Sequence, residues 1–240
     1  MKYSSTEKYW SDHWENTNFK ISPKHHPLRK WIEKNVSITN EASCFEFGCH
    51  PGKFLAIFGE KGYLLNGLDY FESIKLLPQW LKKQKYKVGN FYNLDFYKFN
   101  NKQQYDIVCS FGFVEHFKNL DETIKKHVNI TKQDGLLIIE VPNLKSPLYY
   151  LLYKIFEPST LKNHEISTMD IEKISKSITR SGCVVKNSEY IGYFYFRFVT
   201  KNNKLSKIIS FVINLFRPIF EILPESIYKR YIIVTATKTT

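Results

Sequence analysis

The chain has 240 residues, and 43% of them are hydrophobic, which is enough for one substantial core. Lys and Arg number 35 against 23 acidic residues, so the formal net charge is +12. Such a charge favours anionic partners, namely nucleic acid, phospholipid or a phosphorylated substrate, although basic residues scattered over a solvated surface explain it more simply. No uninterrupted apolar stretch reaches the length of a transmembrane helix, so we expect no membrane-spanning segment.

The first residues, MKYSSTEKYW, are polar and aromatic and lack the apolar segment of a signal peptide. Cys44, Cys49, Cys109 and Cys183 show no CxxC spacing, and three of them lie in apolar runs, where cysteine behaves as a small hydrophobic residue. We therefore expect a cytoplasmic protein with reduced cysteines, and we predict no metal site.

Strands and helices are expected to alternate through the first part of the chain. Residues 1–40 place aromatic residues at helical spacing and predict a helical cap. Over residues 41–143, short apolar runs alternate with amphipathic segments, which predicts parallel strands joined by right-handed crossovers. The expected strands cover residues 43–47, 63–69, 86–90, 105–111 and 135–143, and the expected helices cover 53–62, 71–84 and 119–131.

The second part of the chain, residues 144–240, is expected to form the substrate-side half of the same single domain. A helix is predicted at 170–182, and two closing strands are predicted at 183–196 and 231–238. The whole pattern predicts one α/β domain, with a seven-stranded, mostly parallel sheet, helices on both faces and a helical insertion before the last strand.

A glycine-containing loop, within FEFGCHPG at 45–52, follows the first predicted strand. In an open α/β sheet a ligand binds beyond the carboxyl ends of the strands, so this loop is a candidate binding site. Gly48 and Gly52 let the backbone approach a ligand closely, and the next helix points its amino terminus at that ligand. Asp69 ends the second strand, where an acid can accept hydrogen bonds from both ribose hydroxyls of an adenosine.

The acid ahead of the loop distinguishes between nucleotides. An NAD-binding loop has the spacing GxGxxG and faces a pyrophosphate, whereas this loop has the spacing ExGxxxG. Glu46 would repel a pyrophosphate and attract a positively charged amino group. The spacing therefore disfavours an NAD-linked oxidoreductase and indicates a nucleoside that carries an amino acid.

Taken together, FEFGCHPG, GLDY, VGNFYNLDF, YDIVCSFGFVEHF and LLIIEVPN resemble the successive motifs of class I S-adenosylmethionine-dependent methyltransferases. The resemblance covers about residues 45–143. It implies the Rossmann-like fold of that class, with S-adenosylmethionine as the cofactor. It also implies that the loop surrounds the methionine part of the cofactor and that Asp69 holds the ribose. Asn90 and Phe91 would flank the adenine, and the residues after the fourth strand would lie beside the transferred methyl group. The predicted cofactor-binding residues are Glu46, Gly48, Cys49, His50, Gly52, Asp69, Tyr70, Asn90, Phe91, Ser110 and Phe111.

One residue of the loop departs from the usual ExGxGxG pattern of this family. His50 stands where the middle glycine is common, so the loop must accommodate a Cβ atom and an imidazole. Two interpretations are open: His50 contacts the substrate or the cofactor carboxylate, or it is a loop histidine that faces solvent.

Two histidines are candidate catalytic residues. Glu115 and His116 follow the fourth strand, where many small-molecule and glycan methyltransferases carry an acid–histidine pair. His116 is the first candidate for a general base, because an unperturbed imidazole titrates near physiological pH, and His164 is the second. The alternative is that Glu115 and His116 only join their loop to the next helix, and that His164 makes a structural polar contact.

Weaker similarities suggest the acceptor. VPN at 141–143 and NHEIS at 163–167 resemble methyltransferases of bacterial surface-polysaccharide and lipid modification. We therefore expect O-methylation of a small molecule or glycan, and we do not expect nucleic acid as a partner, since no appended basic domain is visible. An RNA or protein methyltransferase, or an inactive protein that binds the cofactor, are the alternatives.

The insertion expected at 201–229 contains an amphipathic helix over 205–223 that Pro218 bends or breaks. Its apolar face has three interpretations: packing as a lid or core element, a homodimer contact, or peripheral attachment to the inner face of the membrane. Lys207 and Arg217 beside that face would suit an anionic bilayer and a lipid-linked glycan. The protein is accordingly expected to be a monomer or a homodimer.

Overall fold

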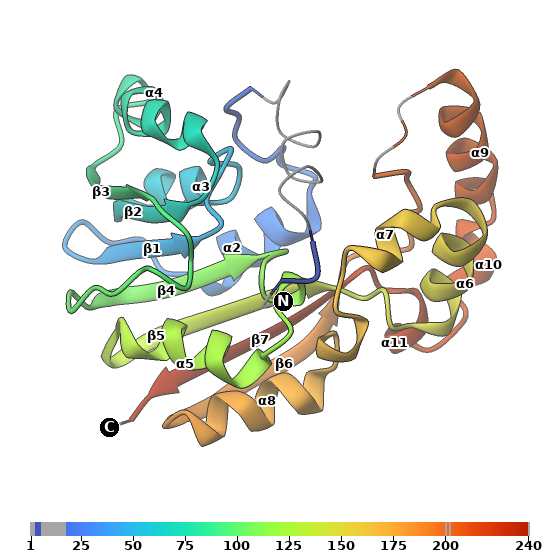
Figure 1. Ribbon diagram of the computed structural model, residues 1–240. Helices are drawn as coiled ribbons and strands as arrows, with labels where there is room; N and C mark the ends of the chain where they lie inside the picture. Colours follow the sequence, from blue (N-terminus) through green and yellow to red (C-terminus); the bar gives the residue numbers. More distant parts are fainter. Residues whose placement is uncertain (1–2, 6–17, 200, 202, 240) are drawn as a thin grey trace.

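The computed structural model describes residues 3–5, 18–199, 201 and 203–239. One seven-stranded sheet crosses the molecule in the order β3-β2-β1-β4-β5-β7-β6 (Figure 1). Neighbouring strands from β3 to β5 are parallel, and β7 is antiparallel to both β5 and β6, which confirms the predicted sheet. The strands are β1 (Ser43–Phe47), β2 (Leu64–Asp69), β3 (Val88–Asn93), β4 (Tyr105–Phe111), β5 (Thr131–Pro142), β6 (Cys183–Ile191) and β7 (Tyr231–Lys238).

Helices cover both faces of this sheet. One face is covered by α2 (Pro27–Asn35), α3 (Leu55–Glu60) and α4 (Leu77–Lys83), and the other by α5 (Leu120–Asn129) and α8 (Ile171–Arg180). The other helical elements are η1 (Glu72–Leu76), η2 (Val114–His116), α6 (Pro147–Phe156), α7 (Pro158–Lys162), η3 (Ile166–Thr168), α9 (Lys204–Leu215), α10 (Arg217–Phe220) and α11 (Glu225–Tyr228).

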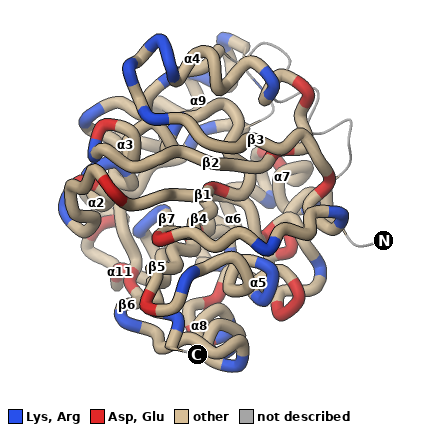
Figure 2. Tube along the Cα trace, turned by 90° about the vertical axis from the view of Figure 1, so that its left-hand side faces the viewer, with Lys and Arg blue, Asp and Glu red and all other residues tan. Residues whose placement is uncertain are grey.

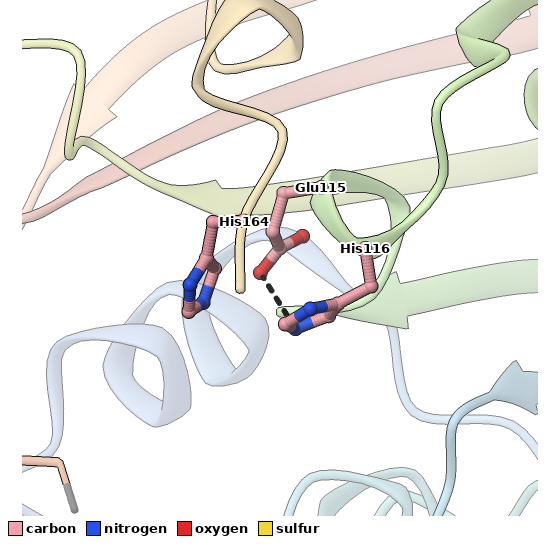
Figure 3. Close-up of side chains that lie close together, drawn as sticks. All are labelled: Glu115, His116 and His164. Atoms are coloured by element: carbon pink, nitrogen blue, oxygen red, sulfur yellow. Dashed lines mark ion pairs between the residues drawn. The ribbon is translucent and has the colours of Figure 1, made fainter. Parts of the chain in front are cut away.

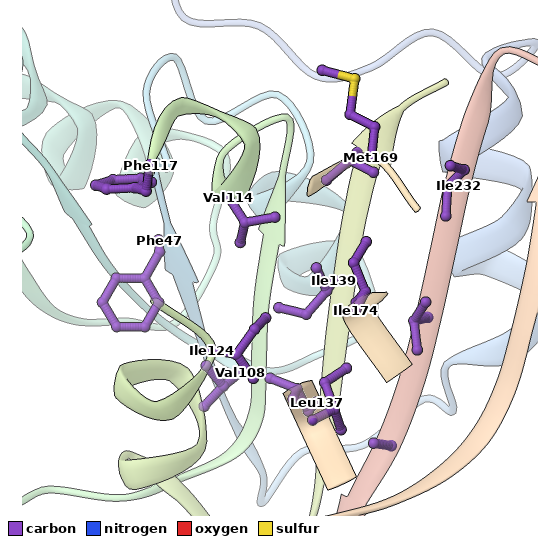
Figure 4. Packing of buried hydrophobic residues seen from close by; sticks show 14 of the residues in the cluster. Phe47, Val108, Val114, Phe117, Ile124, Leu137, Ile139, Met169, Ile174 and Ile232 are labelled. Atoms are coloured by element: carbon purple, nitrogen blue, oxygen red, sulfur yellow. The ribbon is translucent and has the colours of Figure 1, made fainter. Parts of the chain in front are cut away.

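Each central strand contributes side chains alternately to two cores, as a strand buried on both faces must. In β4, Val108 belongs to the α5–α8 core, whereas its neighbours Ile107 and Cys109 belong to the α2–α3 core. Figure 4 shows Val108 beside Ile124 of α5, with Ile139 of β5 nearby. The strands therefore read as continuous apolar runs, and this made them recognisable in the sequence.

Three strand boundaries differ from the predicted ones by three residues or more. β3 continues to Asn93, because this edge strand is half-exposed and its polar residues hid its extent. β5 begins earlier, at Thr131, and β6 ends earlier, at Ile191. In the predicted amino-terminal cap, α2 is helical, and residues 6–17 lie outside the described part of the chain.

The insertion between β6 and β7 is helical, as predicted, and it is broken. α9 ends at Leu215, and Phe216 separates it from α10. Pro218 falls in the first turn of α10, where the missing N–H of proline costs no hydrogen bond of the helix. Figure 1 shows α9, α10 and α11 at the same side of the molecule as α6. None of the described helices is long and apolar enough to cross a bilayer.

An extended segment after β6 depends on side chains for its backbone hydrogen bonds. The amide of Asn214 in α9 donates to the carbonyl of Phe196 at 2.7 Å and accepts from its N–H at 2.9 Å. Glu221 accepts from the N–H of Phe194 at 3.0 Å, and Glu157 accepts from that of Val199 at 2.8 Å. The predicted strand at 183–196 is therefore wrong beyond Ile191, because none of the described strands pairs with this segment.

We expect Asn214→Ala to lower the free energy of unfolding by about 1–3 kcal/mol, since it leaves two backbone groups of Phe196 without partners. Urea unfolding followed by circular dichroism measures the change. Ile208→Ala, which removes an exposed side chain from the same helix, is the control and should change stability by less than about 0.5 kcal/mol. Equal stability of the two variants would show that Asn214 does not hold α9 against the segment.

Candidate functional site

A cavity of about 490 Å³ opens beyond the carboxyl ends of β1, β2 and β4. The sheet order reverses between β1 and β4, the position at which open α/β sheets bind their ligands. Eight of the residues predicted from the sequence line this cavity: Glu46, Gly48, Cys49, His50, Asp69, Tyr70, Phe111 and His116.

The loop after β1 is shaped by two glycines with positive φ. Gly48 has φ +71°, and a Cβ atom there would lie 2.5 Å from the ring of Phe113. Gly52 has φ +83°, and a Cβ atom there would lie 2.7 Å from Leu77. Gly52 does not line the cavity, so its glycine is required by the turn and by α4 rather than by a ligand.

Two carboxylates face the cavity from the ends of β1 and β2. Glu46 is 3% exposed, its Oε2 has no hydrogen-bond partner among the described residues, and burial together with Asp69 raises its pKa well above the usual value. Burial raises the pKa of Asp69 to about 6, although backbone N–H groups of Phe71 and His50 stabilise its charged form. The two acids therefore create a site that favours a cationic group with hydrogen-bond donors.

The structure corrects one interpretation of His50. The residue is 4% exposed, its Nε2 lies 2.6 Å from the Ser73 hydroxyl, and its ring contacts those of Phe19 and Phe71. A solvent-facing loop histidine is therefore excluded. Burial lowers the pKa of His50 to about 4, so the imidazole is neutral at physiological pH and adds no charge beside the carboxylates.

The predicted adenine contacts fall outside the cavity. Asn90 and Phe91 lie within β3, and neither lines the cavity, because the strand continues to Asn93. Residues just beyond the strand line the cavity instead: Leu94 and Phe96 supply apolar surface, and Asp95 supplies a carboxylate. The spacing NLDF was visible in the sequence, and a correct end for β3 would have identified these residues.

Two further residues differ in position from the prediction. Ser110 is fully buried in β4 and does not line the cavity, whereas the next residue, Phe111, does. Tyr3 lines the cavity although no pattern in the sequence indicated it. Its hydroxyl donates to Asp95 at 2.5 Å, and its backbone bridges to Phe117.

The candidate catalytic residues gather at the side of the cavity formed by η2. His116 lines the cavity, and its Nε2 lies 3.8 Å from Oε1 of the buried Glu115. His164 does not line the cavity, yet its ring lies 4.6 Å from that of His116 between centroids (Figure 3). The structure thus brings His164 beside Glu115 and His116, from which the sequence separates it by almost fifty positions.

Basic residues cluster at another part of the wall. Lys53 lines the cavity, and burial, followed by the charges of Arg197 and Lys20, lowers its pKa to about 8. Its Nζ lies 3.3 Å from Nε2 of His26, whose pKa is lowered to about 3 by burial and then by Lys53. Elsewhere, Lys and Arg are distributed over several elements (Figure 2), as expected of a solvated surface.

The residues of the cavity fit a nucleoside that carries an amino acid. Oε2 of Glu46, which has no hydrogen-bond partner among the described residues, can accept a hydrogen bond from an ammonium group, and the Asp69 carboxylate can accept hydrogen bonds from ribose hydroxyls. Leu94 and Phe96 suit the faces of a base. A pyrophosphate would instead meet two carboxylates.

Comparison with known proteins agrees with this site. A family model described as a methyltransferase domain matches residues 18–185, and the chain belongs to this family. Membership confirms the class of S-adenosylmethionine-dependent methyltransferases and its cofactor. A curated relative, the ubiquinone biosynthesis O-methyltransferase of Rickettsia conorii, is 23% identical over 126 residues. That match covers 52% of this chain and 43% of the relative.

Solved structures share the fold. A SAM-dependent methyltransferase from Archaeoglobus fulgidus has a TM-score of 0.59 and 21% identity, covering 88% of this chain and 93% of the other. The magnesium protoporphyrin IX methyltransferase of Synechocystis PCC 6803, solved with bound SAH, has a TM-score of 0.57 and 13% identity, covering 88% and 80%. At these identities the likeness shows the fold alone.

We expect Asp69→Asn to weaken the binding of S-adenosylmethionine by about ten- to a hundredfold, since hydrogen bonds to a charged acceptor contribute roughly 1.5–3 kcal/mol. Glu46→Gln should weaken it similarly by removing the negative charge beside the amino group. Isothermal titration at pH 7.5 measures both affinities. Unchanged affinity in both variants would contradict the assignment of the site.

The pH dependence of the same affinity provides a second readout. Ribose hydroxyls bind the ionised form of Asp69, whose pKa is about 6, so the affinity of the unmodified protein should fall as the pH drops below 6. Asp69→Asn has no carboxyl group to protonate, and the fall attributable to this residue should disappear. Identical pH profiles would show that the ionised carboxylate does not bind the cofactor.

Proposed function

We propose that this protein transfers the methyl group of S-adenosylmethionine to a hydroxyl oxygen of a small-molecule or glycan acceptor. The observation that carries the proposal is the position of His116, which lines the same cavity as the two carboxylates of the cofactor site. The name of the Rickettsia relative, an O-methyltransferase, supports an oxygen acceptor.

The hydrogen bonds of His116 determine which nitrogen can act on the acceptor. Its Nδ1 lies 3.1 Å from the carbonyl oxygen of Asn163. A carbonyl can only accept a hydrogen bond, so Nδ1 carries the proton and Nε2 keeps its lone pair. His116 can therefore take the proton of an acceptor hydroxyl at Nε2.

The transfer depends mainly on alignment of the acceptor oxygen with the methyl carbon, and it needs few chemical groups besides the base. The bound cofactor supplies an electrophilic methyl carbon on a sulfonium sulfur. As the acceptor oxygen forms its bond to that carbon, the carbon–sulfur bond breaks, and Nε2 of His116 receives the hydroxyl proton. Phe96, Phe113 and Phe117 supply apolar walls that exclude water and hold the acceptor in line.

The cluster around Lys53 favours an acceptor that carries negative charge. After burial, the charges of Arg197 and Arg230 lower the pKa values of both Lys53 and His26, and the charge of Lys53 also lowers that of His26. Glu140 acts in the opposite direction and raises the pKa of Lys53. Excess positive charge at the edge of a cavity attracts an anionic ligand. A glycan linked through phosphate, or a carboxylated small molecule, meets this requirement.

The helical insertion supports presentation of the acceptor at a membrane surface. Apolar side chains recur at spacings of three and four along α9, α10 and the residues just after α10, and they are 41–83% exposed. They are Leu205, Ile208, Phe211, Val212, Leu215, Phe216, Ile219, Ile222 and Leu223. This face is accompanied by Lys201, Lys204, Lys207 and Arg217, and residues 201–220 contain no acidic residue. An amphipathic helix with this composition binds anionic lipid.

We expect His116→Ala to lower turnover by about a hundredfold or more, the contribution of a general base, while the affinity for S-adenosylmethionine stays within about twofold. Transfer of radiolabelled methyl groups into polar-lipid and polysaccharide fractions measures turnover. A methyl ether formed on oxygen withstands mild alkali, which separates it from a methyl ester. Lys118→Ala, at an exposed position nearby, is the control. Label found only in RNA or protein would contradict the proposed acceptor class.

The membrane contact has its own test. We expect the double variant Phe211→Asp, Ile219→Asp to stop co-sedimentation with phosphatidylglycerol vesicles, because it places charge in the apolar face. Ile38→Asp alters an exposed apolar residue that is distant in sequence from α9 and α10, and this variant should bind the vesicles as the unmodified protein does. Binding of the unmodified protein should also weaken at high salt. Equal sedimentation of all three proteins would contradict the contact.

A further inference from the structure

Three potential ligands converge between two segments of the chain. Glu115 and His116 belong to η2, and His164 lies between α7 and η3. The N–H of Glu165 donates a hydrogen bond to the carbonyl of Glu115 at 2.7 Å, and this bond holds the two segments together. One ligand atom from each of the three residues lies within 4.8 Å of the others. In Figure 3 both imidazole rings lie beside the carboxylate of Glu115.

The backbone fixes both imidazoles in the same tautomer. Nδ1 of His164 lies 2.6 Å from the carbonyl oxygen of Thr160, just as Nδ1 of His116 faces Asn163. Both Nδ1 atoms therefore carry protons, and both Nε2 atoms present lone pairs. Metal-ligating histidines in proteins are held in this way, with the second nitrogen bonded to a carbonyl or carboxylate.

Glu115 lacks the positive partner that a buried carboxylate requires. Its side chain is 1% exposed, and its Oε2 has no hydrogen-bond partner among the residues that the structure describes. A second buried acid, Glu140, lies close enough to Glu115 to act on it electrostatically. In the described part of the chain, the ion pairs of Glu115 include no Lys or Arg. A cation between the three residues would supply the missing charge.

We propose that Glu115, His116 and His164 bind a divalent first-row transition-metal cation. Two imidazole nitrogens and one carboxylate oxygen suit zinc, manganese, iron or cobalt, whereas magnesium and calcium prefer oxygen ligands alone. Ligand atoms around one such ion lie roughly 3.0–3.5 Å apart, so the cluster closes on the ion by small side-chain rotations. Three protein ligands leave coordination positions open.

His116 also lines the cavity, so an open coordination position can face the acceptor. This role of the ion rests on the proposed function, whereas its binding does not. A hydroxyl bound to the ion would have a lowered pKa and would lose its proton to solvent more readily. Its oxygen would keep the electron pair for attack on the methyl carbon, as the carbon–sulfur bond breaks. In this mode Nε2 of His116 holds the metal, and in the metal-free mode it takes the proton.

Cobalt(II) and zinc titrations of the full chain, first stripped with a chelator and dialysed, test the site. We expect one equivalent of each ion to bind, with cobalt producing visible absorption bands of a low-symmetry site. His164→Gln and Glu115→Gln should weaken binding by more than the roughly 10–100-fold that follows loss of an orienting partner. His25→Ala removes an exposed histidine elsewhere and should bind as before. Circular dichroism and thermal unfolding verify that each variant is folded.

The outcomes separate the metal site from the methyl transfer. No stoichiometric binding by the unmodified chain, or equal binding by the folded His164→Gln and Glu115→Gln variants, would overturn the metal site. Methyl transfer that persists unchanged in chelator would leave His116 as the base and remove the ion from the reaction. Metal binding without transfer to any acceptor would instead overturn the proposed function and leave the site intact.

Discussion

The hydrogen bond from the His50 backbone to the Asp69 carboxylate joins the two strand ends on which the cavity depends. It ties the loop after β1 to the end of β2, and the N–H groups of Gly48 and Cys49 reinforce it by donating to the carbonyl of Leu68. The Asp69 carboxylate thus contributes both to the position of the loop and to the charge of the site. A ligand that binds Asp69 therefore meets a loop already placed by the same side chain, which lowers the conformational cost of binding.

The order of strands and helices could be predicted from the sequence because the central strands are buried on both faces and appear as apolar runs. The ends of edge elements could not. β3 has half-exposed, polar positions, so its end was placed three residues early and the cavity-lining residues just beyond it were missed. The segment after β6 resembles a strand in composition, yet its backbone is satisfied by Asn214 and Glu221, and no local pattern reports such distant partners.

Chemical function is divided between the two ends of the cavity. The β1 and β2 ends present the acids Glu46 and Asp69, and the η2 side presents His116, behind which Glu115 and His164 lie. The pair Glu115–His116 could be found by sequence because it follows β4 directly. Its association with His164 could not, since it depends on how the segment after α7 returns to η2. Burial is common to both ends, and it makes each carboxylate responsive to the charge of whatever binds there.

The position of β7 has a consequence for how the chain is made. This strand lies between β5 and β6 in the sheet but follows the helical insertion in the sequence. During synthesis, β5 and β6 therefore emerge long before the strand that joins them, and their facing edges stay open to other chains. The apolar face of α9 and α10 is also already exposed at that stage. Early contact of this face with a lipid surface or a chaperone would protect the unfinished sheet from aggregation.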